Sequence, residues 1–545
     1  MFKTHQRILL GAATALGIAL LLCAGGCSEL PEGFTLDGAF VGDGGVQTPD
    51  SQPPGDGAPP PSDGPKADSQ QPPPPGVFDW RDAVMYFVML DRFNDGDPSN
   101  NNPEPNVKTP ANWQGGDLAG LLAKIKSGYF AQLGVNVLWL TSPIDTPGGR
   151  YLGVRDPEYY SGYHGYWPGD LEKVEEHLGD LALLKQVVDE AHKQGIKVLL
   201  DYVMNHVHEL SPTYINNKGW FWPNEKNGSD CICGGNCSWA EPEGLKCWFD
   251  PFLPDFNFTL PAARKYSIDN AIKWIKDTGI DGFRLDAVKH IEMSWLTELR
   301  ARVKQEIPLK SGERFYMVGE TFDGDRSVLK KYVNPQTMLD GQFDFPMRAE
   351  LVKVILARQG SFNDLHNFLN GNDGFYGAGS IMGTFLGNHD IPRSIHFAED
   401  NPLWNDVWVN GKERAWTNQP GAPSSDAAYE RLGLGFAALM TLPGVPLIYY
   451  GDEVGMAGAG DPDNRRFMVW SGVSQAQERL RTLIGKLTKI RSEHPALRYG
   501  SRKGVVVQND VYAYEMSHGN DSITVVLNRS DVSKTVTLPK SSYQD

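Results

Sequence analysis

Short apolar runs alternate with amphipathic helical patterns over most of the chain, from residue 84 to residue 451. The apolar runs are Val84–Asp91, Val135–Ser142, Val198–Asn205, Gly282–Asp286, Phe315–Glu320, Gln342–Phe345, Gly383–Asn388 and Pro446–Gly451. The helical patterns are Leu118–Leu133, Leu178–Gln194, Ala262–Thr278, Trp295–Ile307, Arg348–Arg358 and Ala427–Thr441. Strands that alternate with helices in this way predict an α/β fold, a (β/α)8 TIM barrel. An open doubly wound sheet has the same alternation and stays the alternative.

Two further units accompany the predicted barrel, which we place at residues 77–494. Residues 207–256 follow the third strand without a helical pattern, and a connection of that length indicates an inserted subdomain. After a last helical pattern at 475–493, residues 495–545 hold short alternating runs at Val505–Val507, Val511–Glu515 and Ile523–Leu527. These runs predict a short C-terminal antiparallel β-domain. So few strands would leave an open edge, so this domain is either truncated or minimal.

The N-terminus has the pattern of an export signal. Basic residues precede an apolar stretch that ends in Ala24-Gly25-Gly26-Cys27. This ending resembles a bacterial lipobox, which predicts a signal over residues 1–27 with lipidation of Cys27. A plain cleaved signal and an uncleaved anchor are the alternatives. We expect the chain to be exported, and either anchored by lipid to the bacterial cell envelope or secreted.

Residues 28–76 differ in composition from the rest of the chain. They hold 12 Pro, 9 Gly and eight acidic residues against the single Lys66, and we interpret them as a disordered tether. Because residues 1–27 carry +2 and the tether −7, the remaining chain carries −11 of the total charge of −16. An acidic chain is a poor candidate for a nucleic-acid binder. The single long uncharged run also excludes a polytopic membrane protein.

Cysteines cluster in the predicted insertion, at Cys231, Cys233, Cys237 and Cys247. In an oxidising compartment, two local disulfides are the expected state of such a cluster. A four-thiolate zinc site is the rival interpretation, but the spacing lacks the usual paired C-x2-C units. The sequence leaves the pairing of the cysteines open.

Polar residues follow several of the predicted strands, where a barrel enzyme carries its active site. They include Asn205-His206, the run Arg284-Leu-Asp286, Glu320, and Asn388-His389-Asp390. Asp286, Glu320 and Asp390 would converge on one mouth beside Arg284. Acetal cleavage needs a nucleophilic carboxylate and a protonated carboxyl group, and clustered carboxylates keep one of their number protonated. A structural salt bridge is the alternative for each carboxylate alone, but four strand ends in register argue against it.

Several motifs resemble those of the α-amylase family, glycoside hydrolase family 13, over nearly all of residues 77–500. The matching segments are Asp201–His206, Leu253–Asn257, Gly282–His290, Val318–Glu320, Phe385–Asp390, Gly165–Trp167 and Gly444–Glu453. With the lipobox, they indicate an exported lipoprotein form of the family. The resemblance implies that Asp286 is the nucleophile, Glu320 the general acid/base and Asp390 the carboxylate that holds and distorts the reacting sugar.

The resemblance also implies a substrate-binding set. Its members are Tyr166, His164, His206, Arg284, Lys289, His290, His389, Asp461 and Arg465. Tyr166 would stack on the reacting sugar, His206 and His389 would bind its hydroxyls, and Arg284 would set the state of Asp286. Lys289 and His290 would face the acceptor side. Asp461 and Arg465 would face the donor side, and for these two a turn with a surface ion pair is the alternative.

Calcium is the cofactor that the resemblance implies, as one or two ions. The first site would use Asn205, Asp255 and the backbone carbonyl of His290, and would join the barrel to the insertion. The second would use Asp95, Asp97, Asn100, Asn101, Gly115 and Asp117. Hard oxygen ligands suit Ca²⁺, although the same residue types also form ordinary polar turns.

The sequence therefore predicts a retaining, endo-acting hydrolase of α-1,4 bonds in starch, glycogen or maltodextrins. We expect it to be monomeric, with no nucleic-acid partner and with the membrane reached only through the lipid. An α-glucanotransferase is the alternative. Cyclodextrin-forming relatives carry an aromatic residue four positions before Asp255, where this chain has Pro251, and they carry extra C-terminal domains. Phe322 keeps transfer open, because an apolar acceptor side shelters the intermediate from water. A non-catalytic glycan-binding protein is the distant alternative, and it would be expected to lack the three carboxylates.

Overall fold

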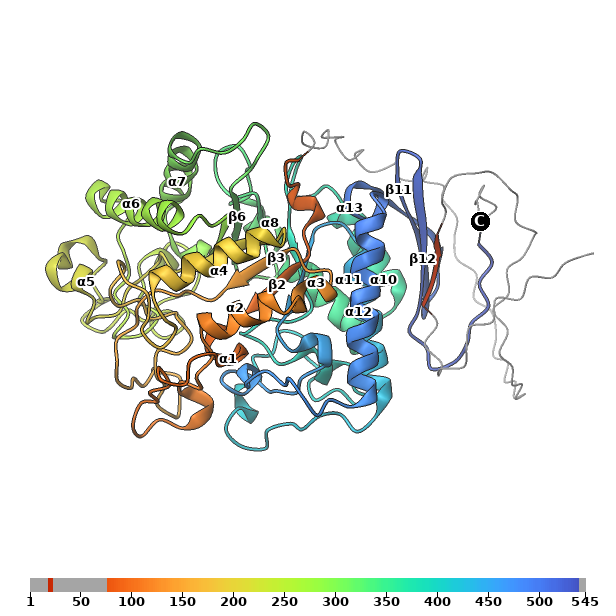
Figure 1. Cartoon of the computed structure of the whole chain (residues 1–545), viewed down its shortest axis with the longest axis horizontal. Helices are drawn as coiled ribbons and strands as arrows, with labels where there is room; N and C mark the ends of the chain where they lie inside the picture. The colour runs from red at the N-terminus through yellow and green to blue at the C-terminus, as the bar shows by residue number, and fades with distance from the viewer. Residues whose placement is uncertain (1–17, 23–75, 539–545) are drawn as a thin grey trace, which may run out of the picture.

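A parallel β-barrel forms the centre of the molecule in the computed structural model, which describes residues 18–22 and 76–538 (Figure 1). Its strands are β2 (Met85–Val88), β3 (Val137–Leu140), β4 (Lys197–Tyr202), β5 (Gly282–Leu285), β6 (Tyr316–Gly319), β7 (Gly341–Gln342), β8 (Gly383–Thr384) and β9 (Val445–Tyr449). They lie in the order β7-β6-β5-β4-β3-β2-β9-β8. A parallel bridge between Phe343 and Gly383 brings the two ends of this sheet together. The TIM barrel is thus confirmed, and the open sheet is wrong.

Aromatic side chains fill the barrel. The rings of Phe87 and Trp139 stack with their centroids 3.7 Å apart, Phe343 stacks on Trp139 at 5.1 Å, and Tyr449 lies 5.3 Å from Phe87. Because both faces of a parallel barrel strand are covered, its residues read as continuous apolar runs, and all four residues of β3 are buried. This burial is the physical reason why the strands can be located from the sequence.

Helices surround the barrel (Figure 1). They are α1 (Leu90–Phe93), α2 (Leu118–Lys126), α3 (Tyr129–Gln132), α4 (Leu181–Lys193), α5 (Pro212–Asn216), α6 (Pro261–Thr278), α7 (Met293–Glu306), α8 (Arg326–Lys330), α9 (Phe345–Leu351), α10 (Phe362–Asn372), α11 (Asp426–Thr441), α12 (Gln475–Glu493) and α13 (Ala496–Tyr499). The single helix predicted over Leu118–Leu133 is wrong: Gly128 adopts a left-handed φ of 75° and separates α2 from α3. The helix predicted over Arg348–Arg358 is α9 followed by a π-helical turn, Val352–Leu356.

The C-terminal sheet lies beyond α10, α11 and α12 at one end of the molecule (Figure 1). Its strands β10 (Ser501–Val507), β11 (Val511–His518) and β12 (Asp521–Asn528) are antiparallel, as predicted. Strand β1 (Ile18–Leu22) pairs with the outer edge of β12, so in the full chain this edge is covered. β1 lies within the predicted export signal, whereas Cys27 and residues 28–75 of the tether lie outside the described residues.

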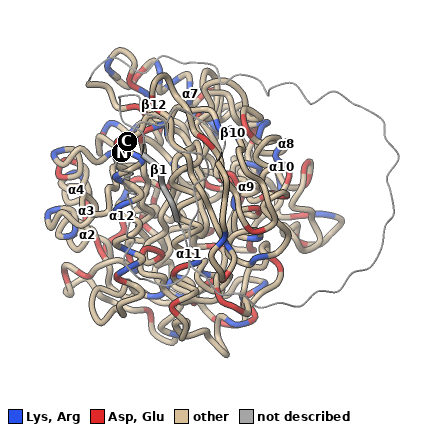
Figure 2. Tube along the Cα trace, turned by 90° about the vertical axis from the view of Figure 1, so that its right-hand side faces the viewer, with Lys and Arg blue, Asp and Glu red and all other residues tan. Residues whose placement is uncertain are grey.

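Charged residues of both signs are interspersed along the chain in the view of Figure 2, without a broad face of one sign. Among the described helices, none is both long and apolar enough to cross a membrane. Anchoring of the chain through a lipid on Cys27 stays a prediction.

Candidate active site

Arg284, on β5, is the centre of a buried charge network at the C-terminal ends of the strands. Its Nη1 donates to Asp201 Oδ1 at 2.8 Å and to Asp286 Oδ1 at 2.7 Å. Its Nη2 lies 3.9 Å from Glu320 Oε2. Asp286 directly follows β5 and Glu320 directly follows β6, which pairs with β5. The barrel register therefore brings both predicted catalytic carboxylates to one arginine.

The side chains of this network differ in their exposure to solvent. The side chains of Arg284 and Asp201 are 1% and 0% exposed, whereas those of Asp286 and Glu320 are 13% and 12% exposed. Asp390, in the segment after β8, is more open, with 36% of its side chain exposed. The three carboxylates that the sequence singled out can thus be reached from solvent, while the groups that hold them are closed off.

Glu320 has the environment of a proton donor. Burial raises the pKa of Glu320 to about 7, and the negative charges of Asp286 and Asp390 act in the same direction, against the lowering effect of Arg284. The backbone N–H of Ala287 donates to Glu320 Oε2 at 3.1 Å. Ala287 adopts a left-handed φ of 46°, which turns the chain toward Glu320 directly after Asp286. Near neutral pH, a large fraction of Glu320 can therefore carry the proton that acetal cleavage needs.

Asp201 holds the network from beneath, and the sequence analysis assigned it no role. Besides Arg284, Asp201 accepts from Tyr166 Oη at 2.8 Å and from Trp139 Nε1 at 3.2 Å. Burial raises the pKa of Asp201 to about 6, while Arg284 lowers it. An aspartate inside the apolar run of a central strand is the signal that could have identified it, because a buried carboxylate needs such partners.

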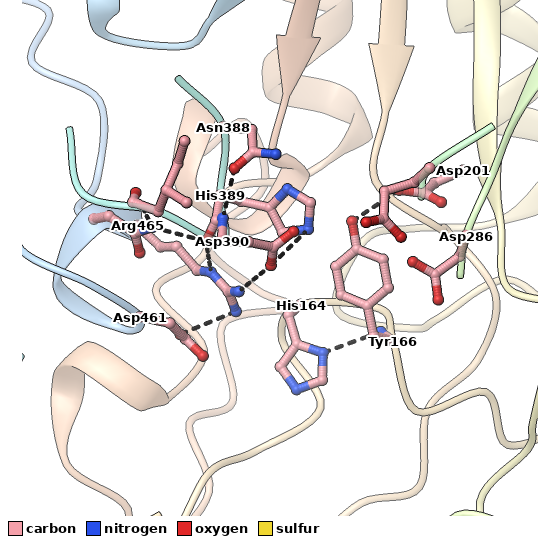
Figure 3. Close-up of polar contacts among 12 residues, drawn as sticks. His164, Tyr166, Asp201, Asp286, Asn388, His389, Asp390, Asp461 and Arg465 are labelled. Carbon is pink, nitrogen blue, oxygen red and sulfur yellow. Dashed lines mark hydrogen bonds and ion pairs between the residues drawn. The ribbon is translucent and has the colours of Figure 1, made fainter. Parts of the chain in front are cut away.

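Tyr166 joins the strand ends to the predicted histidines (Figure 3). Its ring stacks on His389, with centroids 5.1 Å apart and planes 8° from parallel, and its N–H donates to His164 Nδ1 at 3.0 Å. His206 Nε2 lies 3.0 Å from the carbonyl oxygen of Tyr166. Burial lowers the pKa of His164, His206 and His389. Neutral imidazoles suit hydrogen bonding with sugar hydroxyls.

Arg465 connects Asp461 to Asp390 (Figure 3); Asp461 and Arg465 are the two residues predicted to face the donor side. Its guanidinium lies 3.0 Å from Asp461 Oδ1 and 3.4 Å from Asp390 Oδ1, and its Nε donates to the carbonyl oxygen of His389 at 3.0 Å. The Arg465 side chain is only 6% exposed. The alternative of a surface ion pair does not describe Arg465, which is buried and continuous with Asp390, although the Asp461 side chain is 17% exposed.

The residues predicted to face the acceptor side lie after β5 and contact the segment after β6 and the insertion. Lys289 Nζ donates to the carbonyl oxygen of Phe322 at 2.9 Å, and His290 Nδ1 lies 2.7 Å from the carbonyl oxygen of Gly244 in the insertion. The ring of Phe249 lies 4.9 Å from that of His290 and 5.2 Å from that of His206. Pro251 is exposed. An aromatic ring therefore does lie beside these two histidines, supplied by Phe249 rather than by the residue four positions before Asp255.

Oxygen donors converge where the first calcium site is predicted. Asn205 Nδ2 donates to Asp255 Oδ2 at 3.1 Å, and a backbone bridge joins His206 to Asp255. Asn205 Oδ1 and Asp255 Oδ1 are buried and have no hydrogen-bond partner among the described residues. Two such oxygens, one of them from a carboxylate, fit a hard cation.

The second predicted calcium site also carries unsatisfied oxygens. Asn100 Oδ1 and Asn101 Oδ1 are buried without a hydrogen-bond partner among the described residues. Asp117 Oδ2 accepts from the N–H of Asp97 at 2.8 Å, and Asp95 Oδ2 accepts from Asn101 Nδ2 at 2.7 Å. At Gly115, whose φ is 93°, a Cβ would lie 2.5 Å from the Asn101 side chain. The six predicted residues thus lie around one loop that also fits a hard cation.

Glu175, Glu176 and His177 form a cluster of possible ligands that the sequence analysis did not predict. His177 Nδ1 lies 2.6 Å from Glu175 Oε1, and His177 Nε2 lies 2.9 Å from the carbonyl oxygen of Asn102. Both ring nitrogens of His177 therefore have partners, and His177 joins the connection after β3 to Asn102, next to the predicted second calcium site.

Both disulfides are confirmed, and they settle the pairing. Cys231 bonds to Cys237, and Cys233 bonds to Cys247. The zinc interpretation is wrong, because all four sulfurs are used. Gly244, whose carbonyl contacts His290, lies inside the loop that Cys233 and Cys247 close.

Comparison with known proteins identifies the family to which the chain belongs. Residues 87–492 match the family described as "Alpha amylase, catalytic domain". The beta/alpha-amylase of Paenibacillus polymyxa is 30% identical over 84% of this chain, and the cyclomaltodextrin glucanotransferase of Geobacillus stearothermophilus is 29% identical over 85%. The chain spans only 34% and 62% of these two proteins.

Solved structures are matched over more of their length. An Anoxybacillus α-amylase is 30% identical with a TM-score of 0.68, and the match covers 83% of this chain and 88% of that one. CldA, described as a cyclomaltodextrin glucanotransferase with three domains, is 26% identical with a TM-score of 0.63, over 82% and 87% of the two chains. A small number of domains therefore does not distinguish a hydrolase from a transferase. With its (β/α)8 barrel, its strand-end carboxylates and these matches, the chain belongs to the α-amylase family, glycoside hydrolase family 13.

Proposed function

We propose that this enzyme hydrolyses α-1,4-glucosidic bonds of starch, glycogen or maltodextrins, including inner bonds, with retention of the anomeric configuration. The observation that carries the proposal is the pair of reachable carboxylates around Arg284. Asp286 is bound to the arginine at 2.7 Å, while Glu320 has a pKa raised to about 7. One carboxylate with a cationic partner and one that retains a proton are the two groups that a retaining glycosidase needs.

In the proposed first step, Glu320 gives its proton to the glycosidic oxygen while Asp286 attacks the anomeric carbon. The carbon–oxygen bond breaks with its electron pair on the leaving oxygen, and a glycosyl ester forms on Asp286. In the second step, Glu320 takes a proton from water, the water oxygen attacks the anomeric carbon, and Asp286 leaves as a carboxylate. Asp390 and His389 would hold the reacting sugar, with Arg465 fixing Asp390 at 3.4 Å.

Calcium would be held by Asn205, Asp255 and the carbonyl of His290, and at the second site by the residues around Asp117. When bound, it would supply positive charge that fixes oxygen ligands and no group that reacts with the glucan. Asp255 belongs to the insertion and Asn205 to the segment after β4. Occupation of the first site would therefore keep the acceptor-side residues of the insertion in place over the barrel.

Glucanotransferase activity is the second candidate, and Phe249 is the observation that favours it. Its ring beside His206 and His290, together with Phe322 after Glu320, gives the acceptor side an apolar character. Such a wall would favour a sugar over water as the acceptor. Hydrolysis stays the main proposal because the solved Anoxybacillus α-amylase and an α-amylase from Geobacillus thermoleovorans are 30% and 31% identical to this chain, against 26% for CldA.

Soluble starch distinguishes these activities when it is incubated with the enzyme and with an Asp286→Asn variant. We expect the unaltered enzyme to release reducing sugar, with α-anomers in the NMR spectrum of the first products. The variant is expected to lose at least about 10³-fold in rate, equivalent to about 4 kcal/mol of barrier. No release of reducing sugar by the unaltered enzyme would contradict hydrolysis, and a digest dominated by cyclic or lengthened products would establish transfer.

A further inference from the structure

A hairpin lies in the connection after β3, and we name it the donor-side strap, residues 151–160. Tyr151 and Tyr160 close it with two backbone hydrogen bonds of 2.9 Å. Leu152, Val154 and Tyr159 are 44%, 53% and 39% exposed. Because these apolar side chains are not packed into the core, polar contacts have to hold the tip of the strap.

On one side, the strap is tied to the insertion. Arg155 donates to the carbonyl oxygen of Cys233 at 2.7 Å and to that of Phe249 at 3.1 Å. The N–H of Val154 donates to Asp250 Oδ1 at 2.7 Å. The insertion segment that receives these bonds is braced by both disulfides, so this end of the strap rests on a stiff support.

On the other side, the strap is tied to the segment after β8. Asp156 Oδ1 lies 2.9 Å from Lys412 Nζ. The neighbouring Gly411 accepts from the N–H of Gly460 at 3.0 Å, directly beside Asp461. Burial lowers the pKa of Lys412, but the charges of Asp461 and Asp156 outweigh it and raise the pKa, in keeping with the backbone contact between Gly411 and Gly460. Because β2 and β9 lie between β3 and β8 in the barrel, this contact joins two connections whose preceding strands are not neighbours.

We propose that the donor-side strap closes the donor end of the glucan site, so that the contact between Asp156 and Lys412 limits the length of the product. This inference rests on the proposed function. A glucan that runs from Lys289 past Asp286 and Glu320 to Asp461 meets Lys412 and Asp156 next. While the contact holds, few sugar units are accommodated on the donor side of the cleaved bond, so short products are favoured from inner bonds as well as from chain ends. When the contact opens, longer segments are accommodated and longer products are released.

The contact is suited to opening without damage to the barrel. The side chains of Lys412 and Asp156 are 40% and 18% exposed, so the ion pair is open to water and salt. Its loss would free the strap tip from the β8 segment but would leave the bonds of Arg155 to the insertion in place.

Lys412→Ala tests the proposal in the full chain, with amylose as substrate and products separated by chromatography at low conversion. We expect the average product length to rise at least twofold, and iodine staining to fall at least threefold faster per reducing end released. Lys412→Arg keeps the charge and is expected to behave as the unaltered enzyme. Asp156→Asn breaks the same pair from the strap and provides a second variant if Lys412→Ala folds poorly.

Glu158→Gln is the matched control. Glu158 lies on the same strap and pairs with Lys108 at 2.5 Å, away from Lys412. Its loss should leave the product lengths unchanged. Product lengths that stay the same in Lys412→Ala and Asp156→Asn, in an enzyme that hydrolyses starch, would overturn this inference alone. An unaltered enzyme that releases no reducing sugar would overturn the proposed function and this inference with it.

Discussion

Glu320 and Asp286 each directly follow a barrel strand, but their contacts with Arg284 differ. Asp286 has a hydrogen bond from Arg284 at 2.7 Å, whereas the nearest contact of Arg284 to Glu320 is 3.9 Å. The weaker contact leaves burial as the dominant influence on Glu320 and gives it a pKa of about 7. At the residue scale, the division of labour between two carboxylates follows from slightly more than one ångström of distance to a shared cation.

The pH profile should report this difference. Because Glu320 must be protonated to act as the acid, kcat/KM is expected to fall as pH rises through about 7. Lys289 lowers the pKa of Glu320, so Lys289→Met should move the alkaline limb to higher pH. Lys265→Met, at an exposed helix position, is the control and should leave the limb in place. A limb that moves to lower pH in Lys289→Met would contradict the assignment of Glu320 as the acid.

Asp201 should contribute strongly to stability, because its buried carboxylate pairs with the buried Arg284. Asp201→Asn removes one of the three charged partners of Arg284, the most deeply buried of them, and we expect a loss of about 3–5 kcal/mol in the free energy of unfolding. Asp426→Asn removes an exposed partner of Arg479 and should cost about 1 kcal/mol or less. Denaturant unfolding measures both. Equal losses in the two variants would show that Asp201 does not hold the buried charge.

At the scale of the elements, the two disulfides of the insertion should make separate contributions to the free energy of unfolding. Replacing Cys233 and Cys247 by Ser opens a 14-residue separation and should cost about 3 kcal/mol, against about 2 kcal/mol for the 6-residue separation of Cys231 and Cys237. Because Gly244 lies within the longer loop and contacts His290, the first variant should also raise KM for maltodextrins. Unfolding curves and steady-state kinetics on both double variants check this order. The reverse order would contradict the pairing described above.

What the sequence predicts at the element scale depends on burial and on chain distance. Strands β3 and β5 could be located because residues buried on both faces form continuous apolar runs, and Asp286 and Glu320 could be assigned because they directly follow such runs. The break at Gly128 between α2 and α3 was missed, since the apolar period continues through it. Contacts between distant segments, such as Asp156 with Lys412, leave no local pattern that a single sequence reveals.

At the scale of the whole molecule, calcium would couple the insertion to the barrel. A chelator is expected to lower the thermal unfolding temperature, and added Ca²⁺ to restore it, because an ion present at 100 times its Kd stabilises the folded state by about 2.7 kcal/mol. Mg²⁺ should restore less, since it demands a smaller octahedral site. Asp255→Ala should be less sensitive to the chelator than the unaltered enzyme. Calorimetry with and without chelator makes the comparison, and an unchanged melting temperature in the unaltered enzyme would contradict both calcium sites.

The N-terminal segment can serve either as a strand of the C-terminal sheet or as a cleaved export signal, but not as both. In the full chain, Ile18–Leu22 pairs with β12, with Ile18 opposite Leu527, whereas export with cleavage before Cys27 would remove those residues. We propose the second role: the mature enzyme begins at a lipid-bearing Cys27, and β12 becomes the edge of the C-terminal sheet. Labelling with a fatty acid in a bacterial host should then mark the unaltered chain and Cys23→Ser but not Cys27→Ser. Mass spectrometry should find residues 1–26 absent, and a mature chain that retains Ile18–Leu22 would show instead that β1 is a permanent strand of the fold.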